Sequence, residues 1–208
     1  MTTLTGFSRT AAVDHARERW VDEIAATPGN ARSSEDMTDE ALMLRVQRGD
    51  KEAFRLLVGR HIDRIVGTAR RIVGAAEAED VAQDVFLKVW MVRDQWAPGQ
   101  AAFRTWLYRV AVNRCIDHVR RARPTSIDEV PEIADDAPGP LAECERREEG
   151  SRLRAAMGHL SDQQRTAITL YYHESLTAAE VAEIMGLRLN AVESLLKRGR
   201  QKLRTVLK

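Results

Sequence analysis

Apolar residues recur every three or four positions along most of this chain, and the two-residue alternation typical of strands is almost absent. Gly, Pro or capping residues interrupt this helical pattern at intervals. They delimit four predicted helices in the N-terminal half, at residues 39–48, 51–73, 76–94 and 101–123. Two shorter helices are predicted near the C-terminus. The pattern therefore predicts an all-α fold.

The two C-terminal helices are marked by their own start and stop signals. Thr177 with Glu180 three residues later forms a capping box, and Asn190 with Glu193 is a looser version of it. Gly186 lies between the two starts, where the first helix needs a stop. These signals predict two helices joined by a tight turn.

The second of these helices has an apolar face and a basic face. Its core-facing positions share helical spacing and are Val192, Leu196, Gly199 and Leu203. Its outward positions are Ser194, Lys197, Arg198, Gln201 and Lys202. Such a face suits the major groove and its flanking phosphates, which predicts a helix-turn-helix that binds DNA. The alternative is a solvated helical hairpin whose basic residues only confer solubility. The segregation of positive charge here, in a chain of net charge +1, favours DNA binding.

The helix predicted at 101–123 carries six arginines and a single acidic residue. One face combines an aromatic ring, an amide and guanidinium groups, at Trp106, Arg109, Asn113 and Arg120. These groups can stack on unpaired bases, bond their edges and neutralise phosphates. The alternative makes the aromatic residues part of the core, and for Tyr108 that alternative is preferred.

The helix predicted at 76–94 presents an apolar inner face of Val81, Val85, Phe86, Val89 and Trp90. Its outer face includes Asp80, Gln83, Asp84 and Lys88. From spacing alone, a solvated surface is favoured there over an interface.

Residues 124–145 contain seven acidic residues, four prolines and no base. Such a segment buries too little apolar surface to fold alone, so it is predicted to be a flexible acidic linker between two small helical domains.

Other function classes find little support in the sequence. The five histidines are scattered without metal-ligand spacing, and no Gly-rich phosphate loop or nucleophile motif is present. Cys115 and Cys144 are interpreted as ordinary thiols. We therefore expect no enzyme, no metal and no cofactor. No apolar run is long enough to cross a bilayer and no signal peptide is evident, so a cytoplasmic protein without membrane insertion is expected.

The motif blocks AEDVAQDVFLKVW and FRTWLYRVAVNRCIDHVRR, the acidic linker, and LSDQQRTAITLYYHESLTAAEVAEIMGLRLNAVESLLKRGRQKLR together resemble an extracytoplasmic-function (ECF) sigma factor of bacterial RNA polymerase. The resemblance implies a sigma region 2 domain at 37–123, a linker at 124–147 and a sigma region 4 domain at 148–208. Residues 1–36 lie outside it. They are interpreted as an N-terminal extension whose apolar spacing is compatible with one amphipathic helix. This extension is either an upstream start-site artefact or a regulatory arm.

The resemblance also implies roles for individual residues. The surface that docks on the clamp helices of the polymerase's largest catalytic subunit would comprise Asp80, Gln83, Asp84 and Lys88. The surface that opens the minus-10 element would comprise Phe103, Trp106, Arg109, Asn113 and Arg120, with the loop 96–102 shaping a pocket for a flipped base. The minus-35 element would meet Asn190, Glu193, Ser194, Lys197, Arg198, Arg200 and Lys202. The implied partners are the two largest subunits of core RNA polymerase, promoter DNA and an anti-sigma factor.

Some interpretations remain open. Related recognition helices often carry basic residues where this chain has Glu193 and Leu195, so the promoter sequence does not transfer. Glu193 either closes the helix cap or accepts a hydrogen bond from a cytosine amino group. The linker either threads the polymerase cleft or is a plain tether. The competing functions are a helix-turn-helix regulator that binds duplex operator DNA without polymerase, and an adaptor that binds polymerase without reading DNA.

Overall fold

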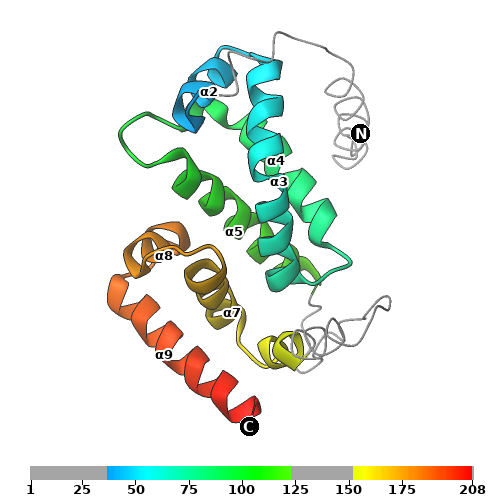
Figure 1. The fold of residues 1–208 in the computed structure, drawn as a ribbon, viewed down its shortest axis with the longest axis vertical. Coiled ribbons are helices and arrows are strands. Elements are labelled where there is room, and N and C mark those ends of the chain that lie inside the picture. Colours follow the sequence, from blue (N-terminus) through cyan, green and yellow to red (C-terminus); the bar gives the residue numbers. More distant parts are fainter. Residues whose placement is uncertain (1–36, 123–151, 208) are drawn as a thin grey trace, which may run out of the picture. The chain divides into compact units, whose positions relative to one another are not determined.

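The structure, a computed structural model, describes residues 37–122 and 152–207. The chain divides into two compact units, residues 1–60 and 61–208. Within the described residues the regular structure is helical and contains no strand, as the all-α prediction requires (Figure 1). The predicted N-terminal extension and acidic linker lie outside the described residues.

In the first unit, helix α2 (Asp39–Gln47) and the start of α3 (Lys51–Val73) are joined by a short turn. The Thr38 side chain caps α2 by accepting from the Ala41 amide at 3.3 Å. Gly49 adopts a φ of 87°, which a residue without a side chain reaches at no steric cost. Asp50 then accepts from the Ala53 amide at 3.0 Å, which starts α3. The predicted break between residues 48 and 51 is therefore confirmed.

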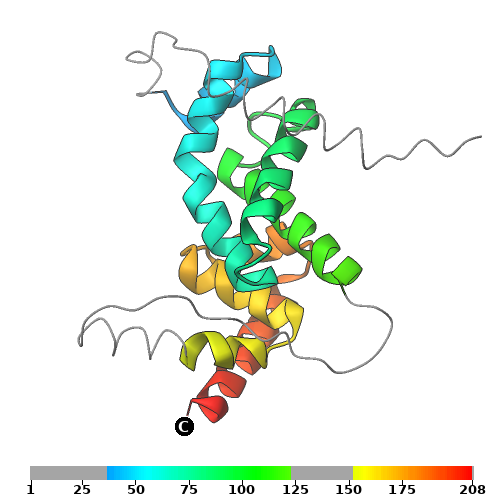
Figure 2. The ribbon, with the colours of Figure 1, turned by 90° about the vertical axis from the view of Figure 1, so that its right-hand side faces the viewer.

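In the second unit, α3 is followed by α4 (Ala78–Met91), a short 3-10 helix η2 (Arg93–Gln95) and α5 (Phe103–Ala122). Helices α4 and α5 contact each other and run side by side in both views (Figures 1 and 2). The apolar face predicted for α4 is buried, apart from a half-buried Trp90. The single helix predicted over 76–94 is too long, because the chain tightens into η2 after Val92.

The C-terminal helices are α7 (Asp162–Ile168), a π-helical turn η3 (Thr169–His173), α8 (Ala178–Met185) and α9 (Leu189–Val206). The capping box of Thr177 and Glu180 is present, and Gly186 ends α8 in the left-handed conformation at φ 63°. These predictions are confirmed. The predicted cap at Asn190 is wrong. The cap position lies two residues earlier, at an extended Arg188 that makes no side-chain cap bond, and α9 begins at Leu189.

The predicted inner face of α9 packs against α7. Val192, Leu196 and Gly199 are buried, while Leu203 is half-buried. Gly199 permits an especially close approach, because a Cβ atom there would lie 2.7 Å from Cδ1 of Ile168 on α7. No helix among the described residues is long and apolar enough to span a membrane.

Candidate nucleic-acid interface

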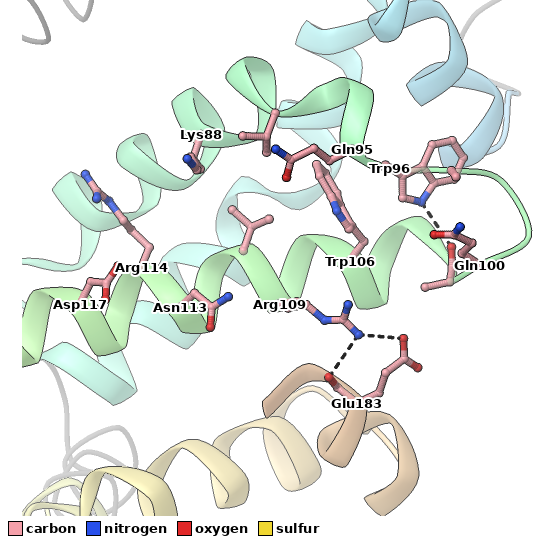
Figure 3. A pocket seen from close by; sticks show the side chains of 14 residues that line it. Lys88, Gln95, Trp96, Gln100, Trp106, Arg109, Asn113, Arg114, Asp117 and Glu183 are labelled. Atoms are coloured by element: carbon pink, nitrogen blue, oxygen red, sulfur yellow. Dashed lines mark hydrogen bonds and ion pairs between the residues drawn. The ribbon is translucent and has the colours of Figure 1, made fainter. Parts of the chain in front are cut away.

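One face of α5 lines a cavity of about 610 Å³. Trp106, Arg109 and Asn113 come from α5, and Trp96 and Gln100 come from the loop before it (Figure 3). Three of the five residues predicted to contact the minus-10 strand therefore lie together at one cavity. Arg120, two turns further along α5, is exposed and is not among the lining residues.

The loop 96–102 is fastened to the start of α5. The Trp96 indole Nε1 donates to the main-chain oxygen of Ala101 at 3.3 Å, and the Trp96 side chain is buried. Its ring meets Phe103 edge-on, with centroids 6.4 Å apart. Trp96 thus ties the first residue of this loop to its end and to the start of α5, and the side chains that the loop gives to the cavity, Trp96 and Gln100, are aromatic and amide rather than charged.

Phe103 is buried, although it was predicted to contact the minus-10 strand. Its side chain is 1% exposed and packs near His61 and Trp106, at ring centroid distances of 5.6 and 6.0 Å. A buried ring has no free face on which a base can stack. In this structure Phe103 supports the Trp106 ring from behind instead of lining the cavity. Tyr108 is buried as preferred from the sequence.

Arg109 reaches from α5 to α8. Its Nη2 donates to both the main-chain oxygen and Oε1 of Glu183, at 3.2 and 3.1 Å (Figure 3). Glu183 lies in the last turn of α8, where uncapped carbonyls and the helix dipole favour a cation. Both side chains are nearly half exposed. Nothing local in the sequence indicated this contact, which joins residues 74 positions apart.

The residues predicted to dock on polymerase lie on α4. Asp80 and Lys88 are exposed and Gln83 is half-buried. Asp84 turns toward α5 and accepts from Arg114 Nη2 at 2.6 Å. Lys88 also lines the cavity (Figure 3). The stripe formed by Asp84 and Lys88 therefore borders the α5 surface.

The residues predicted to meet the minus-35 element are all exposed on α9 and comprise Asn190, Glu193, Ser194, Lys197, Arg198, Arg200 and Lys202. The Arg198 Nε donates to the Ser194 main-chain oxygen at 3.3 Å, and the Arg200 Nη1 donates to the Tyr172 hydroxyl at 3.4 Å. Leu195, considered above as a possible determinant of promoter sequence, is 6% exposed. It belongs to the core and has no surface to offer DNA.

A cluster that the sequence did not reveal surrounds Glu174, directly after η3. Its side chain is buried, and its carboxylate accepts from the hydroxyls of Tyr108 on α5 and Thr68 on α3. Arg104 donates to its main-chain oxygen. Burial, with a smaller contribution from the Glu174 carboxylate, raises the pKa of Tyr108 well above its ordinary value. The hydroxyl therefore stays protonated and acts as a donor.

Comparison with known proteins gives two family matches in chain order. Residues 57–125 match the family model described as Sigma-70 region 2, and residues 151–203 match Sigma-70, region 4. An ECF RNA polymerase sigma-E factor of Haemophilus influenzae is 34% identical over 179 residues, which cover 81% of this chain and 94% of that protein. An RNA polymerase sigma-H factor of Pseudomonas aeruginosa is 35% identical over 175 residues, covering 78% and 90%.

Solved structures show the same relationship. CnrH, solved in complex with the cytosolic domain of CnrY, is 28% identical with a TM-score of 0.63, and the match covers 81% of this chain and 96% of CnrH. The sigma factor RpoE of Bartonella quintana, solved with the anti-sigma factor NepR, is 22% identical with a TM-score of 0.60 and shares the fold.

Proposed function

This chain belongs to the ECF sigma factors of bacterial RNA polymerase, and we propose that its α5 cavity captures a base of the minus-10 element while α9 holds the minus-35 element. The observation that carries the proposal is the clustering of Trp106, Arg109 and Asn113 around one cavity within the region 2 match. Its volume lies in the usual range of about 300–1,000 Å³ for small-ligand sites.

Each group at the cavity has a part in opening the duplex. Trp106 is half-buried and offers a ring to an unstacked base, Asn113 offers an amide to a base edge, and Arg109 offers charge to a phosphate. Phe103 and Trp96 hold this surface in shape from the core. Because extruding a base costs a few kcal/mol, stacking and edge bonds must offset it, and no catalytic residue is needed.

The exposed face of α9 supplies the second anchor. In this proposal its exposed lysines and arginines neutralise phosphates of a major groove, and the exposed Glu193 and Ser194 contact base edges. On α4, the surface around Asp80, Gln83 and Lys88 docks on the polymerase. An anti-sigma factor is the proposed regulator of this chain, as membership of the ECF family implies. The competing regulator function finds no support, because the N-terminal half matches sigma region 2.

The test is runoff transcription with purified core polymerase, combined with a fluorescent base analogue in the minus-10 non-template strand. Trp106→Ala should weaken opening by about 1–3 kcal/mol, the usual contribution of one base stacked on an aromatic ring. Arg70→Ala, which removes an exposed arginine on α3, is the control and should leave opening unchanged. Absence of promoter-dependent product from the wild-type chain on any genomic template would refute the sigma activity. Normal opening by the Trp106 variant would refute the cavity's role.

A further inference from the structure

Glu193 is an acidic residue on an otherwise basic helix. Helix α9 carries five lysines and arginines and one acid, Glu193, and the side chains of all six are exposed. When this face lies against DNA, the carboxylate is held near phosphates of the same sign, and like charges repel. An acid at this position therefore weakens binding to DNA in general, unless it makes a contact that only one base pair offers.

The structure excludes a capping role for Glu193. A capping box would need Asn190 as the cap and Glu193 as the third helical residue. Instead the cap position is Arg188 and α9 begins at Leu189, so Glu193 is the fifth residue of the helix. It lies after the first turn, where the helix dipole gives an acid little stabilisation. Within residues 37–122 and 152–207, the Glu193 side chain makes no hydrogen bond and no ion pair, so its carboxylate is available to a group outside the chain.

The place of Glu193 along α9 suits contact with a base edge. In a helix-turn-helix, residues near the start of the second helix enter the major groove. The exposed polar residues in the first two turns of α9 are Asn190, Glu193 and Ser194, and Glu193 is the charged one among them. Leu195 is 6% exposed and cannot take part. A strong preference for one base at this end of α9 therefore depends on the Glu193 carboxylate.

A carboxylate can distinguish cytosine from the other three bases in the major groove. It offers acceptors only, and cytosine presents its N4 amino group there as a donor. Guanine and thymine present acceptor oxygens, which a carboxylate repels. Adenine presents an N6 donor directly beside the N7 acceptor, so attraction to one is offset by repulsion from the other. Cytosine is therefore the base that Glu193 favours.

We propose that Glu193 contacts one cytosine of the minus-35 element and thereby restricts this chain to promoters that carry it. The proposal rests on the proposed function, because it takes α9 as the helix that lies in the minus-35 major groove. The basic residues of α9 supply affinity for any sequence through the phosphates. Glu193 lowers that affinity wherever its carboxylate meets an acceptor, and so adds selectivity by repulsion as well as by attraction.

The first test is transcription by holoenzyme reconstituted with purified core polymerase. The template pool is randomised at the minus-35 element and barcoded in the transcribed region, so that sequencing the transcripts gives the product from each minus-35 sequence. The wild type should favour a C·G pair at one position by about tenfold, the usual effect of one mismatched pair. Glu193→Ala should lose the preference at that position and keep those at the others.

Glu193→Gln changes the expected base. A glutamine side chain bonds N6 and N7 of adenine together, so the same position should now favour adenine. Asp63→Asn is the matched control, because it removes an exposed negative charge on α3 and should leave every preference unchanged. The proposal is overturned if either Glu193 variant keeps the full cytosine preference. It is also overturned if the preferences weaken equally at all positions, or if the position that changes did not favour cytosine in the wild type.

Binding without polymerase provides a second measurement. Duplexes randomised at the minus-35 element are added to the full chain with excess non-specific DNA, and the bound duplexes are sequenced. Glu193→Ala should bind non-specific duplex more tightly than the wild type, because a repelling charge is gone, while its preference for cytosine disappears. Tighter binding with an unchanged preference would show an acid that only repels DNA, which overturns the proposal.

The two measurements separate this proposal from the function on which it rests. If the wild-type holoenzyme makes no promoter-dependent product, the sigma function fails, and the binding measurement still decides the role of Glu193. If the wild type is active and both Glu193 variants share its base preferences, the contact with cytosine alone fails.

Discussion

The close approach of α9 to α7 at Gly199 yields a prediction whose size follows from the geometry. A Cβ at residue 199 would lie 2.7 Å from Cδ1 and 3.3 Å from Cγ1 of Ile168, and Ile168 is 6% exposed. Overpacking at such a buried site costs about 1–3 kcal/mol. Replacing Gly by Ala inside a helix contributes about 1 kcal/mol in the opposite direction. Gly199→Ala should therefore lower the free energy of unfolding by up to about 2 kcal/mol.

The clash identifies its own compensating substitution. Ile168→Val removes Cδ1, the nearer of the two clashing atoms, at a cost of about 0.5–1.5 kcal/mol as a single change. In that background the clash is relieved, so Gly199→Ala should cost less or stabilise. The double-mutant cycle should show a favourable coupling of about 1–2 kcal/mol between the two positions.

The assay is urea unfolding of the full chain followed by helical circular dichroism. Gly59→Ala is the matched control, because Gly59 is also inside a helix, α3, and a Cβ there meets nothing within 4 Å. That variant should be more stable than the wild type by about 0.5–1 kcal/mol. The reasoning is refuted if Gly199→Ala stabilises as much as Gly59→Ala, or if the effects at 168 and 199 add within about 0.5 kcal/mol.

Three further outcomes are expected. Arg198→Ala should weaken binding to minus-35 duplexes of every sequence and reduce the salt slope, log K against log salt concentration, by about 0.9, because one phosphate contact releases its counterion; an unchanged slope argues against a phosphate contact. Burial raises the pKa of Cys115 to about 12, so in a Cys144→Ser background the native chain should not react with a thiol reagent at pH 8, and reaction at the rate of a free thiol contradicts a buried Cys115. Arg165 donates to four main-chain oxygens, among them that of Ile72 at 3.1 Å, so Arg165→Met should lower the free energy of unfolding by about 1–3 kcal/mol, and a variant as stable as the wild type contradicts this.

The helix boundaries were largely predictable because local chemistry sets them. Thr177, Glu180 and Gly186 determine the ends of α8 through bonds within four residues of each other, so the sequence contains the full signal. Asn190 was misassigned because α9 starts from an extended backbone at Arg188 that uses no side-chain cap. A favourable capping residue shows where a helix can begin, but the helix can also begin at a different residue.

The faces of the helices were predictable only in part. Leu195 lies three residues after Val192 and four before Gly199, so its burial was within reach of the periodicity. Phe103 lies four residues before the buried Leu107, so the same helical spacing predicts that it is buried. Its assignment to the DNA-binding surface did not use this spacing. The Glu174 cluster had no local signal at all. Its donors are 66 and 106 positions away in sequence, and only the folded chain brings them to one carboxylate.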